Sequence, residues 1–247
     1  MIKGKSNFSG ITKLLVATGS GPGPIVEVIN LDDSNPDLVC EDLPDFPLYI
    51  GYATGQLYNK KYPVICGGES ALSNYSTSCE CHAFRDGAWQ PIQSLSECKS
   101  GLASAVFSNP NGEEDDILLI TGGRKDVYSA LSTVESFDGT LWNQTIFADL
   151  PTTIDMHCMV KINNTMLMQI GGTVDASYSG ATESTYLFDV IQNKWIPGPK
   201  LNVPRINHSC AVMIWANPNT GIEEQVRFNL EKDDQTAIAK IKIFCLI

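Results

Sequence analysis

The segment Met168-Gln169-Ile170-Gly171-Gly172 decides the fold of this chain, because an apolar run that ends in paired glycines occurs three times in it. The same ending occurs at Gly67-Gly68 and at Gly122-Gly123. The first glycines of the three pairs are separated by 55 and then by 49 residues, and a weaker copy ends at Gly19, 49 residues before Gly68. Self-similarity at this spacing indicates an architecture of repeated units, each of about 50 residues.

An aromatic residue and then a tryptophan follow each glycine pair, as Phe188 and Trp195 do in the last unit. Glycine permits a positive φ and a close approach of neighbouring backbone, where a Cβ would collide. Tryptophan supplies a large apolar wedge between units, with an indole N–H that needs an acceptor. We therefore expect architectural roles for the residues that the units share, which are Gly67, Gly68, Gly122, Gly123, Gly171, Gly172, Trp89, Trp142 and Trp195.

The apolar residues within each unit predict strands. They come in short, β-branched runs bounded by Gly, Pro, Asn and Asp. Residues 156–162 and 166–171 flank Asn163-Asn164-Thr165, whose turn chemistry predicts a tight hairpin. No window of helical period occurs before residue 222. Four strands in each unit predict an all-β fold made of propeller blades.

These features resemble the kelch-repeat family. The shared pattern is a Gly-Gly that ends the second strand, an aromatic and a Trp in the third and fourth strands, and an Arg-X-X-His that opens the next repeat, here Arg205 to His208. The resemblance covers residues 12–216 and implies a kelch-type β-propeller that presents loops to a protein partner. His157 and His208 occupy the same repeat position, which favours a structural role over catalysis.

The repeats predict the domain organisation. Residues 1–221 are expected to form a kelch propeller with a partial first blade that lacks a Trp, three full blades and the first strand of another. This count fits either four to five blades, with residues 206–215 closing the ring, or a fragment of a larger propeller. Residues 222–247 form a divergent tail. Its alternating end, residues 237–247, predicts an added strand at an open blade edge, or else the tail is disordered.

Three cysteines of one unit are disulfide candidates. Cys66 ends a second strand, and Cys79 and Cys81 are placed on the third strand beside it, within the range that a disulfide bridges. Cys66 needs only one of them, which leaves the other for Cys98 or Cys40. The alternative is that all are reduced, buried thiols. The Cys-Gly-Gly and Cys-bearing strand resemble those of secreted invertebrate kelch proteins, which favours a bridge.

Two further cysteines and the sequons bear on the compartment. Cys158 and Cys210 are placed on equivalent innermost strands, where burial as free thiols is expected. Five Asn-X-Ser/Thr sequons occur, at Asn7, Asn74, Asn143, Asn163 and Asn207, and we take Asn74, Asn143 and Asn163 as glycosylation candidates. They favour an extracellular protein. The apolar stretch within residues 1–21 is too short for a signal peptide, so a cytoplasmic location, or a chain that lacks its true beginning, is the alternative.

Composition and motifs exclude several classes of function. The net charge of −11 disfavours binding to nucleic acid, and no apolar run is long enough to span a membrane. The acidic residues lie in turns, and the sequence lacks metal-site spacing, phosphate loops and nucleophile motifs. We expect a non-enzymatic module, without a cofactor, that binds a protein through its loops. The alternatives are an intracellular kelch adaptor, as in ubiquitin ligases or actin-associated proteins, and a propeller enzyme such as a sugar oxidase.

Overall fold

The computed structural model describes residues 13–17, 24–30, 41–70, 72, 75–175 and 180–212 of the 247. The predicted tail of residues 222–247, the Asn74 sequon, Cys40 and Cys245 lie outside these ranges. No helix of the described ranges is long and apolar enough to cross a membrane.

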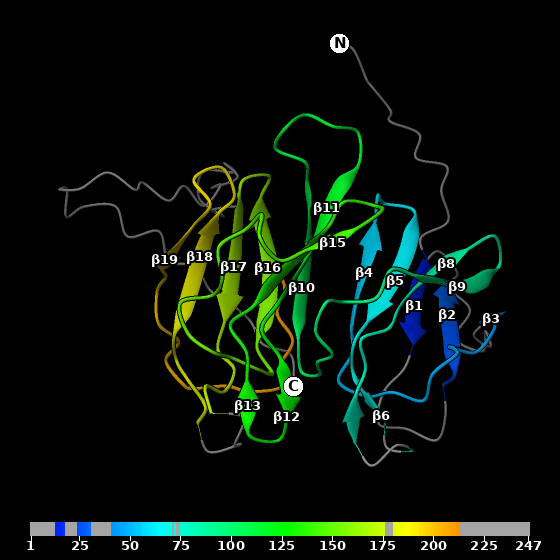
Figure 1. The fold of residues 1–247 in the computed structure, drawn as a ribbon, viewed down its shortest axis with the longest axis horizontal. Coiled ribbons are helices and arrows are strands. Elements are labelled where there is room, and N and C mark those ends of the chain that lie inside the picture. The colour runs from blue at the N-terminus through cyan, green and yellow to red at the C-terminus, as the bar shows by residue number, and fades with distance from the viewer. Residues whose placement is uncertain are drawn as a thin grey trace, which may run out of the picture.

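Three four-stranded antiparallel sheets form the body of the described chain (Figure 1). The second blade has the strand order β4-β5-β8-β9, formed by Thr54–Tyr58, Tyr62–Cys66, Cys81–Arg85 and Ala88–Ile92. The third blade has the order β10-β11-β14-β15, formed by Ala103–Ser108, Asp116–Thr121, Val134–Phe137 and Trp142–Asn143. The fourth blade has the order β16-β17-β18-β19, formed by Cys158–Asn163, Met166–Ile170, Thr185–Asp189 and Lys194–Pro197.

A smaller sheet precedes these blades. It has the order β1-β2-β3, formed by Lys13–Ala17, Val26–Asn30 and Glu41–Asp42. β1 corresponds to the second strand of a blade, because it leads into the weak glycine copy at Gly19. In the described ranges this sheet has three strands, in the region where the sequence predicts a partial first blade. The described residues 205–212, expected to start another blade, contain no strand.

Two short hairpins extend the connection between the second and third strands of a blade. β6 (Glu69–Ser70) pairs with β7 (Ser76–Thr77) after the second strand of the second blade. β12 (Arg124–Asp126) pairs with β13 (Ser129–Ala130) at the same place in the third blade. Both hairpins project from the same end of the molecule (Figure 1). Because they belong to equivalent connections, this end collects loops from successive blades.

The paired glycines lie where the backbones of neighbouring blades meet. Gly122 has a φ of 56°, and a Cβ built on it would overlap the carbonyl oxygen of Ile154 from the following connection. Gly171 repeats the arrangement, because its Cβ would lie 2.8 Å from the carbonyl oxygen of Arg205 and 2.8 Å from Cε1 of His208. Both observations confirm the expected close approach between blades.

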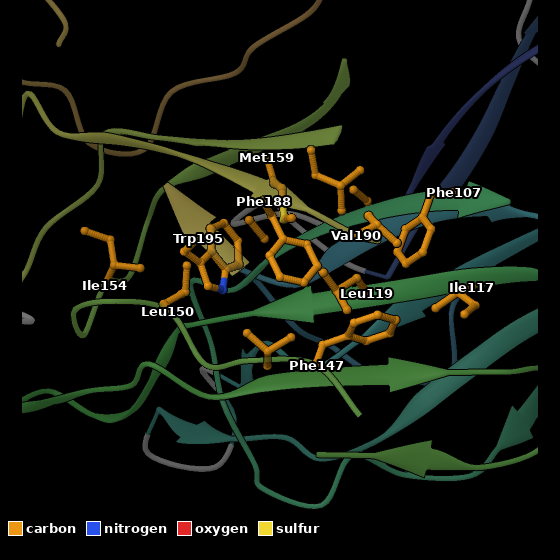
Figure 2. Close-up of a cluster of buried hydrophobic side chains, with 14 residues drawn as sticks. Phe107, Ile117, Leu119, Phe147, Leu150, Ile154, Met159, Phe188, Val190 and Trp195 are labelled. Atoms are coloured by element: carbon orange, nitrogen blue, oxygen red, sulfur yellow. The ribbon is translucent and has the colours of Figure 1, made fainter. Parts of the chain in front are cut away.

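Aromatic side chains fill the space between the blades. Trp195 lies beside Phe188 and Leu150 in the core between the third and fourth blades (Figure 2), with its ring centroid 4.6 Å from that of Phe188. Phe147, from the connection between these blades, meets Phe107 and Phe188 edge to face. The equivalent pair Phe137 and Trp142 lies in the core between the second and third blades. The predicted wedge therefore occurs at both junctions.

The predicted hairpin of the fourth blade is also present. β16 and β17 pair antiparallel from Cys158 opposite Ile170 to Asn163 opposite Met166. The side-chain Oδ1 of Asn163 accepts a hydrogen bond from the backbone N–H of Thr165 at 2.9 Å, which closes the turn. The local turn chemistry read from Asn163-Asn164-Thr165 therefore produced the expected structure.

Candidate functional site

Large apolar side chains lie exposed at the end of the propeller where the β6–β7 and β12–β13 hairpins project. We call this set the hairpin face, and its members, with their exposed fractions, are Leu72 (77%), Tyr75 (66%), Val127 (58%), Tyr128 (87%) and Val174 (39%). They come from the same connection of three successive blades. Exposed apolar side chains grouped on one surface mark a candidate interaction site.

The hairpin that carries Tyr128 is held in a defined conformation. The carboxylate of Asp126 accepts a hydrogen bond from the backbone N–H of Tyr128 at 2.8 Å. This hydrogen bond is the main cause that lowers the pKa of Asp126. The neighbouring hairpin is joined to it, because the Thr77 hydroxyl donates to the carbonyl oxygen of Lys125 at 3.1 Å. The exposed tips are therefore presented on ordered turns.

A chain of ion pairs lies at the base of the two hairpins. Nη2 of Arg124 is 3.1 Å from Oε2 of Glu69, and Nη1 of Arg124 is 3.5 Å from Oδ2 of Asp155. The hydroxyl of Ser100 donates to the same Glu69 oxygen at 3.1 Å. Glu69 begins β6, Arg124 begins β12, and Asp155 lies in the connection that leads into the fourth blade. One guanidinium therefore links three successive blades.

Asp155 is an unusual member of this chain because it is 0% exposed. Burial raises its pKa to about 6, although Arg124 opposes the shift. The nearby carboxylates of Asp175 and Glu69 raise the pKa further. Within the described residues, its Oδ1 atom has no hydrogen-bond partner. Asp155 therefore exchanges a proton close to neutral pH, unlike a solvated aspartate.

Backbone hydrogen bonds join the connections around the same end. The N–H of Gly101 donates to the carbonyl oxygen of Tyr52, that of Met156 to Gly101, and that of Asn207 to Met156, at 2.9, 2.7 and 2.9 Å. All four residues have a positive φ. Since these residues occupy equivalent repeat positions, the hydrogen bonds form a repeating link between blades. They give the hairpin face a rigid base.

A buried ion pair reinforces this base. Nζ of Lys99 lies 2.7 Å from Oε1 of Glu135, and neither side chain is exposed. Lys99 also donates to the hydroxyl of Thr133 at 3.1 Å, and the backbone N–H of Ser96 donates to the second oxygen of Glu135 at 2.8 Å. Lys99 comes from the connection after the second blade and Glu135 from β14. The pair therefore holds the second and third blades together.

The two repeated histidines lie against the glycine pairs. His157 is buried, and its Nε2 is hydrogen-bonded to the hydroxyl of Thr121 at 2.9 Å. Burial lowers its pKa to about 3, so His157 is neutral at physiological pH. His208 has no hydrogen-bond partner at either ring nitrogen in the part of the chain that the structure describes. Of the ring nitrogens of His157 and His208, only Nε2 of His157 therefore has a hydrogen-bond partner within the described residues.

The structure contains three disulfides. Cys66 is paired with Cys81, directly opposite it in the β5–β8 register, and Cys79 is paired with Cys98. Both pairings are among those that the sequence left open. Cys79 precedes β8, however, rather than lying on the third strand as expected.

The third disulfide corrects the expectation that Cys158 and Cys210 are free thiols, because they are bonded to each other. His157 is one residue before Cys158, but His208 is two residues before Cys210, so the cysteines are offset by one repeat position. This offset brings them side by side. Thr54 and Ser104, on the adjacent innermost strands β4 and β10, make the equivalent contact through their hydroxyls at 2.6 Å.

The described sequons lie at the surface. Asn143 and Asn163 are exposed, and each accepts hydrogen bonds from the backbone N–H and the hydroxyl of the Thr two residues later. By strand direction, both lie at the end opposite the hairpin face. Asn207 is also exposed. Glycans at Asn143 and Asn163 would leave the hairpin face uncovered.

A cavity of 670 Å³ lies between the first sheet and the second blade. Its walls are mostly apolar. Of its polar side chains, Thr54 contacts the hydroxyl of Ser104, Gln56 donates to the carbonyl oxygen of Ser104, and Lys61 lies over the ring of Tyr62. Substrate sites need convergent polar groups to orient a ligand. In the described ranges, no cluster of three or more His, Cys, Asp or Glu side chains is arranged to hold a metal ion.

Sequence reasoning did not identify Glu69, Arg124 and Asp155. A signal was present, because the residues that directly follow the three glycine pairs are Glu69, Arg124 and Thr173. Polar residues that recur directly after the glycine pairs, where neighbouring blades meet, indicate side chains that converge. No comparable repeat in the sequence indicated that the tips of the hairpins are exposed and apolar.

No family model matches the sequence, and no curated protein matches it. Among solved structures, the one titled "Structure of YjhT" resembles this chain with a TM-score of 0.64 and 14% sequence identity. The match covers 81% of this chain and 66% of that chain, so this chain spans less than two thirds of the length of YjhT.

This likeness establishes the fold. The chain is an all-β protein whose three four-stranded antiparallel sheets are arranged as the blades of a kelch-type propeller. Its disulfides indicate an oxidising environment.

Proposed function

We propose that this protein is a non-enzymatic, extracellular module that binds a protein partner through its hairpin face. One observation carries the proposal: Leu72, Tyr75, Val127, Tyr128 and Val174 lie exposed on equivalent connections of three successive blades. Large apolar and aromatic side chains of this kind supply most of the binding energy in protein interfaces.

The base of the face supports this use. Rigid surfaces bind with less loss of conformational entropy than mobile loops do. Here the tips stand on paired strands, on the hydrogen bond from Thr77 to Lys125, and on the ion pairs of Arg124. A partner would therefore meet side chains that are already positioned.

Three disulfides support the extracellular location, because such bonds persist in secreted proteins and are rare in the cytosol. They argue against an intracellular adaptor. The non-enzymatic part of the proposal draws on the cavity beside the second blade, whose walls are mostly apolar and whose Thr54 and Gln56 side chains are hydrogen-bonded to Ser104.

Glycosylation of the Asn74 sequon would limit the part of the hairpin face that a partner can reach. Asn74 directly precedes Tyr75, so a glycan there would cover the tip of the β6–β7 hairpin. Val127, Tyr128 and Val174 would remain accessible. We therefore place the centre of the partner surface on the β12–β13 hairpin.

Comparative capture tests the proposal. The chain is produced by secreting cells, immobilised, and exposed to the extracellular fluid and surface proteins of the tissue that makes it. The double variant Val127→Ser/Tyr128→Ser removes the main tips. The matched control Leu141→Ser/Ile191→Ser changes two exposed apolar residues, 57% and 63%, in turns at the opposite end. Equal melting temperatures show that all three proteins are folded.

Quantitative mass spectrometry then compares the captured proteins. We expect a protein that the wild type and the control retain and the hairpin variant loses. Retention by all three proteins, or loss with the control alone, would exclude the hairpin face as the partner surface.

A further inference from the structure

We propose that the ion-pair chain Glu69–Arg124–Asp155 makes the hairpin face sensitive to pH, so that acidification detaches Arg124 from Asp155 and loosens the β12–β13 hairpin. The role of this device in partner release rests on the proposed function. The structural change itself does not, and it is measured without any partner.

The geometry connects the ion pairs to the hairpin directly. Arg124 is the first residue of β12, and its backbone N–H and C=O both exchange hydrogen bonds with Ser100, at 2.8 and 2.9 Å. Its side chain reaches Glu69 in one direction and Asp155 in the other. Val127 and Tyr128 follow within four residues. The contacts of Arg124 therefore set the base of the hairpin that carries the most exposed member of the face.

Asp155 is the member of the chain that responds to acid. It is fully buried, it faces Arg124 of β12, Glu69 of β6 and Asp175, and its Oδ1 has no described partner. Burial raises its pKa to about 6. Between pH 7 and pH 5 the carboxylate therefore takes up a proton, and its attraction to Arg124 disappears.

The pKa values of the neighbouring histidines and of Asp126 are all shifted downward, away from that of Asp155. Burial lowers the pKa of His157 to about 3, and burial also lowers the pKa of His208. Asp126, on the hairpin itself, has a pKa held below its ordinary value by hydrogen bonds. A transition near pH 6 at this end of the propeller is therefore assigned to Asp155.

Protonation has two consequences. At neutral pH, opening of the hairpin separates Arg124 from a charged Asp155 that stays buried. The free energy needed to leave this charge without its partner keeps the hairpin closed. After protonation that cost is gone, so the hairpin opens more readily. The ion-pair chain of Glu69, Arg124 and Asp155 also changes from a net charge of −1 to zero. A partner with a cationic surface would bind at neutral pH and dissociate in an acidic compartment.

Hydrogen exchange with mass spectrometry tests the structural change. The full chain is labelled from pH 5.0 to 7.5, and protection is corrected for the intrinsic pH dependence of exchange. We expect protection of residues 124–131 to fall by about fivefold or more below a midpoint near pH 6. Asp155→Asn should show the low protection at every pH. The control Asp126→Asn should keep the wild-type midpoint.

A second variant keeps the test decisive if Asp155→Asn does not fold. Glu69 raises the pKa of Asp155, so Glu69→Gln should move the midpoint to lower pH. Wild-type protection that is constant over this interval, a wild-type transition that persists in Asp155→Asn, or an unmoved midpoint in Glu69→Gln would overturn the proposal. If protection changes as expected and the capture experiment finds no partner, the proposed function fails and the pH-sensitive hairpin stands.

Discussion

The indole Nε1 of Trp142 donates a hydrogen bond to the backbone carbonyl oxygen of Gln93 at 2.8 Å, across the junction between the third and second blades. Trp89 makes the same hydrogen bond to Pro44 at 3.0 Å, and Trp195 makes it to Ala148 at 2.8 Å. Each tryptophan thus fastens its blade to the connection that precedes it. The three tryptophans are equivalent, as the repeat pattern predicted.

Trp142→Ala should therefore lower the free energy of unfolding by about 3–5 kcal/mol, because it removes a buried ring and leaves the Gln93 carbonyl without its donor. Urea denaturation followed by circular dichroism measures this loss. The control Trp142→Phe keeps part of the wedge and should cost less. A loss below about 1 kcal/mol for the alanine variant would show that Trp142 does not hold the blade junction.

Gly122→Ala should be strongly destabilising. The new Cβ overlaps the carbonyl oxygen of Ile154, and the φ of 56° is unfavourable for alanine by about 1–2 kcal/mol even without the overlap. Gly112→Ala is the matched control, because its φ is 77° but its Cβ would meet nothing within 4 Å. We expect Gly122→Ala to cost about 3 kcal/mol or more, and Gly112→Ala only the conformational part. Equal losses in chemical denaturation would contradict the close blade contact.

Lys99→Met should cost about 3–5 kcal/mol, because it leaves the carboxylate of Glu135 buried without a counter-charge. Lys99→Met/Glu135→Leu should recover most of that loss, since the desolvated charge is removed together with its partner. Lys200→Met, which breaks the exposed pair with Glu183, should leave stability unchanged. The three variants are compared by thermal unfolding. A double variant as unstable as Lys99→Met would show that the ion pair itself stabilises the fold.

Secretion should place glycans at Asn143 and Asn163. Both are exposed in turns, so an oligosaccharide meets no steric obstacle from the described chain. Asn143→Gln and Asn163→Gln should each reduce the mass of the secreted protein by one glycan, as measured by intact mass spectrometry before and after amidase treatment. Partner capture should be unchanged, because these sites lie at the end opposite the hairpin face. An unaltered mass in either variant shows that its sequon is unused.

The fold was predictable because its determinants are local and repeated. Gly122 and Gly171 meet the same steric demand one blade apart, and Trp142 and Trp195 make the same hydrogen bond, so each unit carries the whole pattern. The ion-pair chain was not predictable in the same way. Arg124 is 55 residues from Glu69 and 31 from Asp155, and only the stacking of the blades brings the three together.

The third disulfide was missed for a related reason. The repeat pattern places Cys158 and Cys210 at equivalent positions, and equivalent residues of successive blades lie apart. The structure offsets them by one position, in the arrangement that Thr54 and Ser104 use between β4 and β10. Register between non-consecutive strands depends on how blades pack, and a single sequence does not specify it.

The pH dependence of global stability gives the last prediction. The pKa of Asp155 is about 6 in the folded protein and about 3.9 in an unfolded chain. A raised pKa means that the folded state binds the proton more tightly. The stability that this proton supplies is therefore complete below about pH 4 and is lost as the pH rises through about 6.

Asp155→Asn removes this dependence, because the amide is neutral at every pH. The free energy of unfolding of the variant, relative to wild type, should therefore rise by up to about 3 kcal/mol between pH 4 and pH 7 and then level off. Urea denaturation at half-unit steps of pH measures it, with Asp126→Asn as the exposed control. The Asp126 variant lacks the rise, because hydrogen bonds lower the pKa of that carboxylate. Parallel curves for wild type and Asp155→Asn would show that Asp155 is not a buried, titrating carboxylate, and the pH-sensitive hairpin would lose its basis.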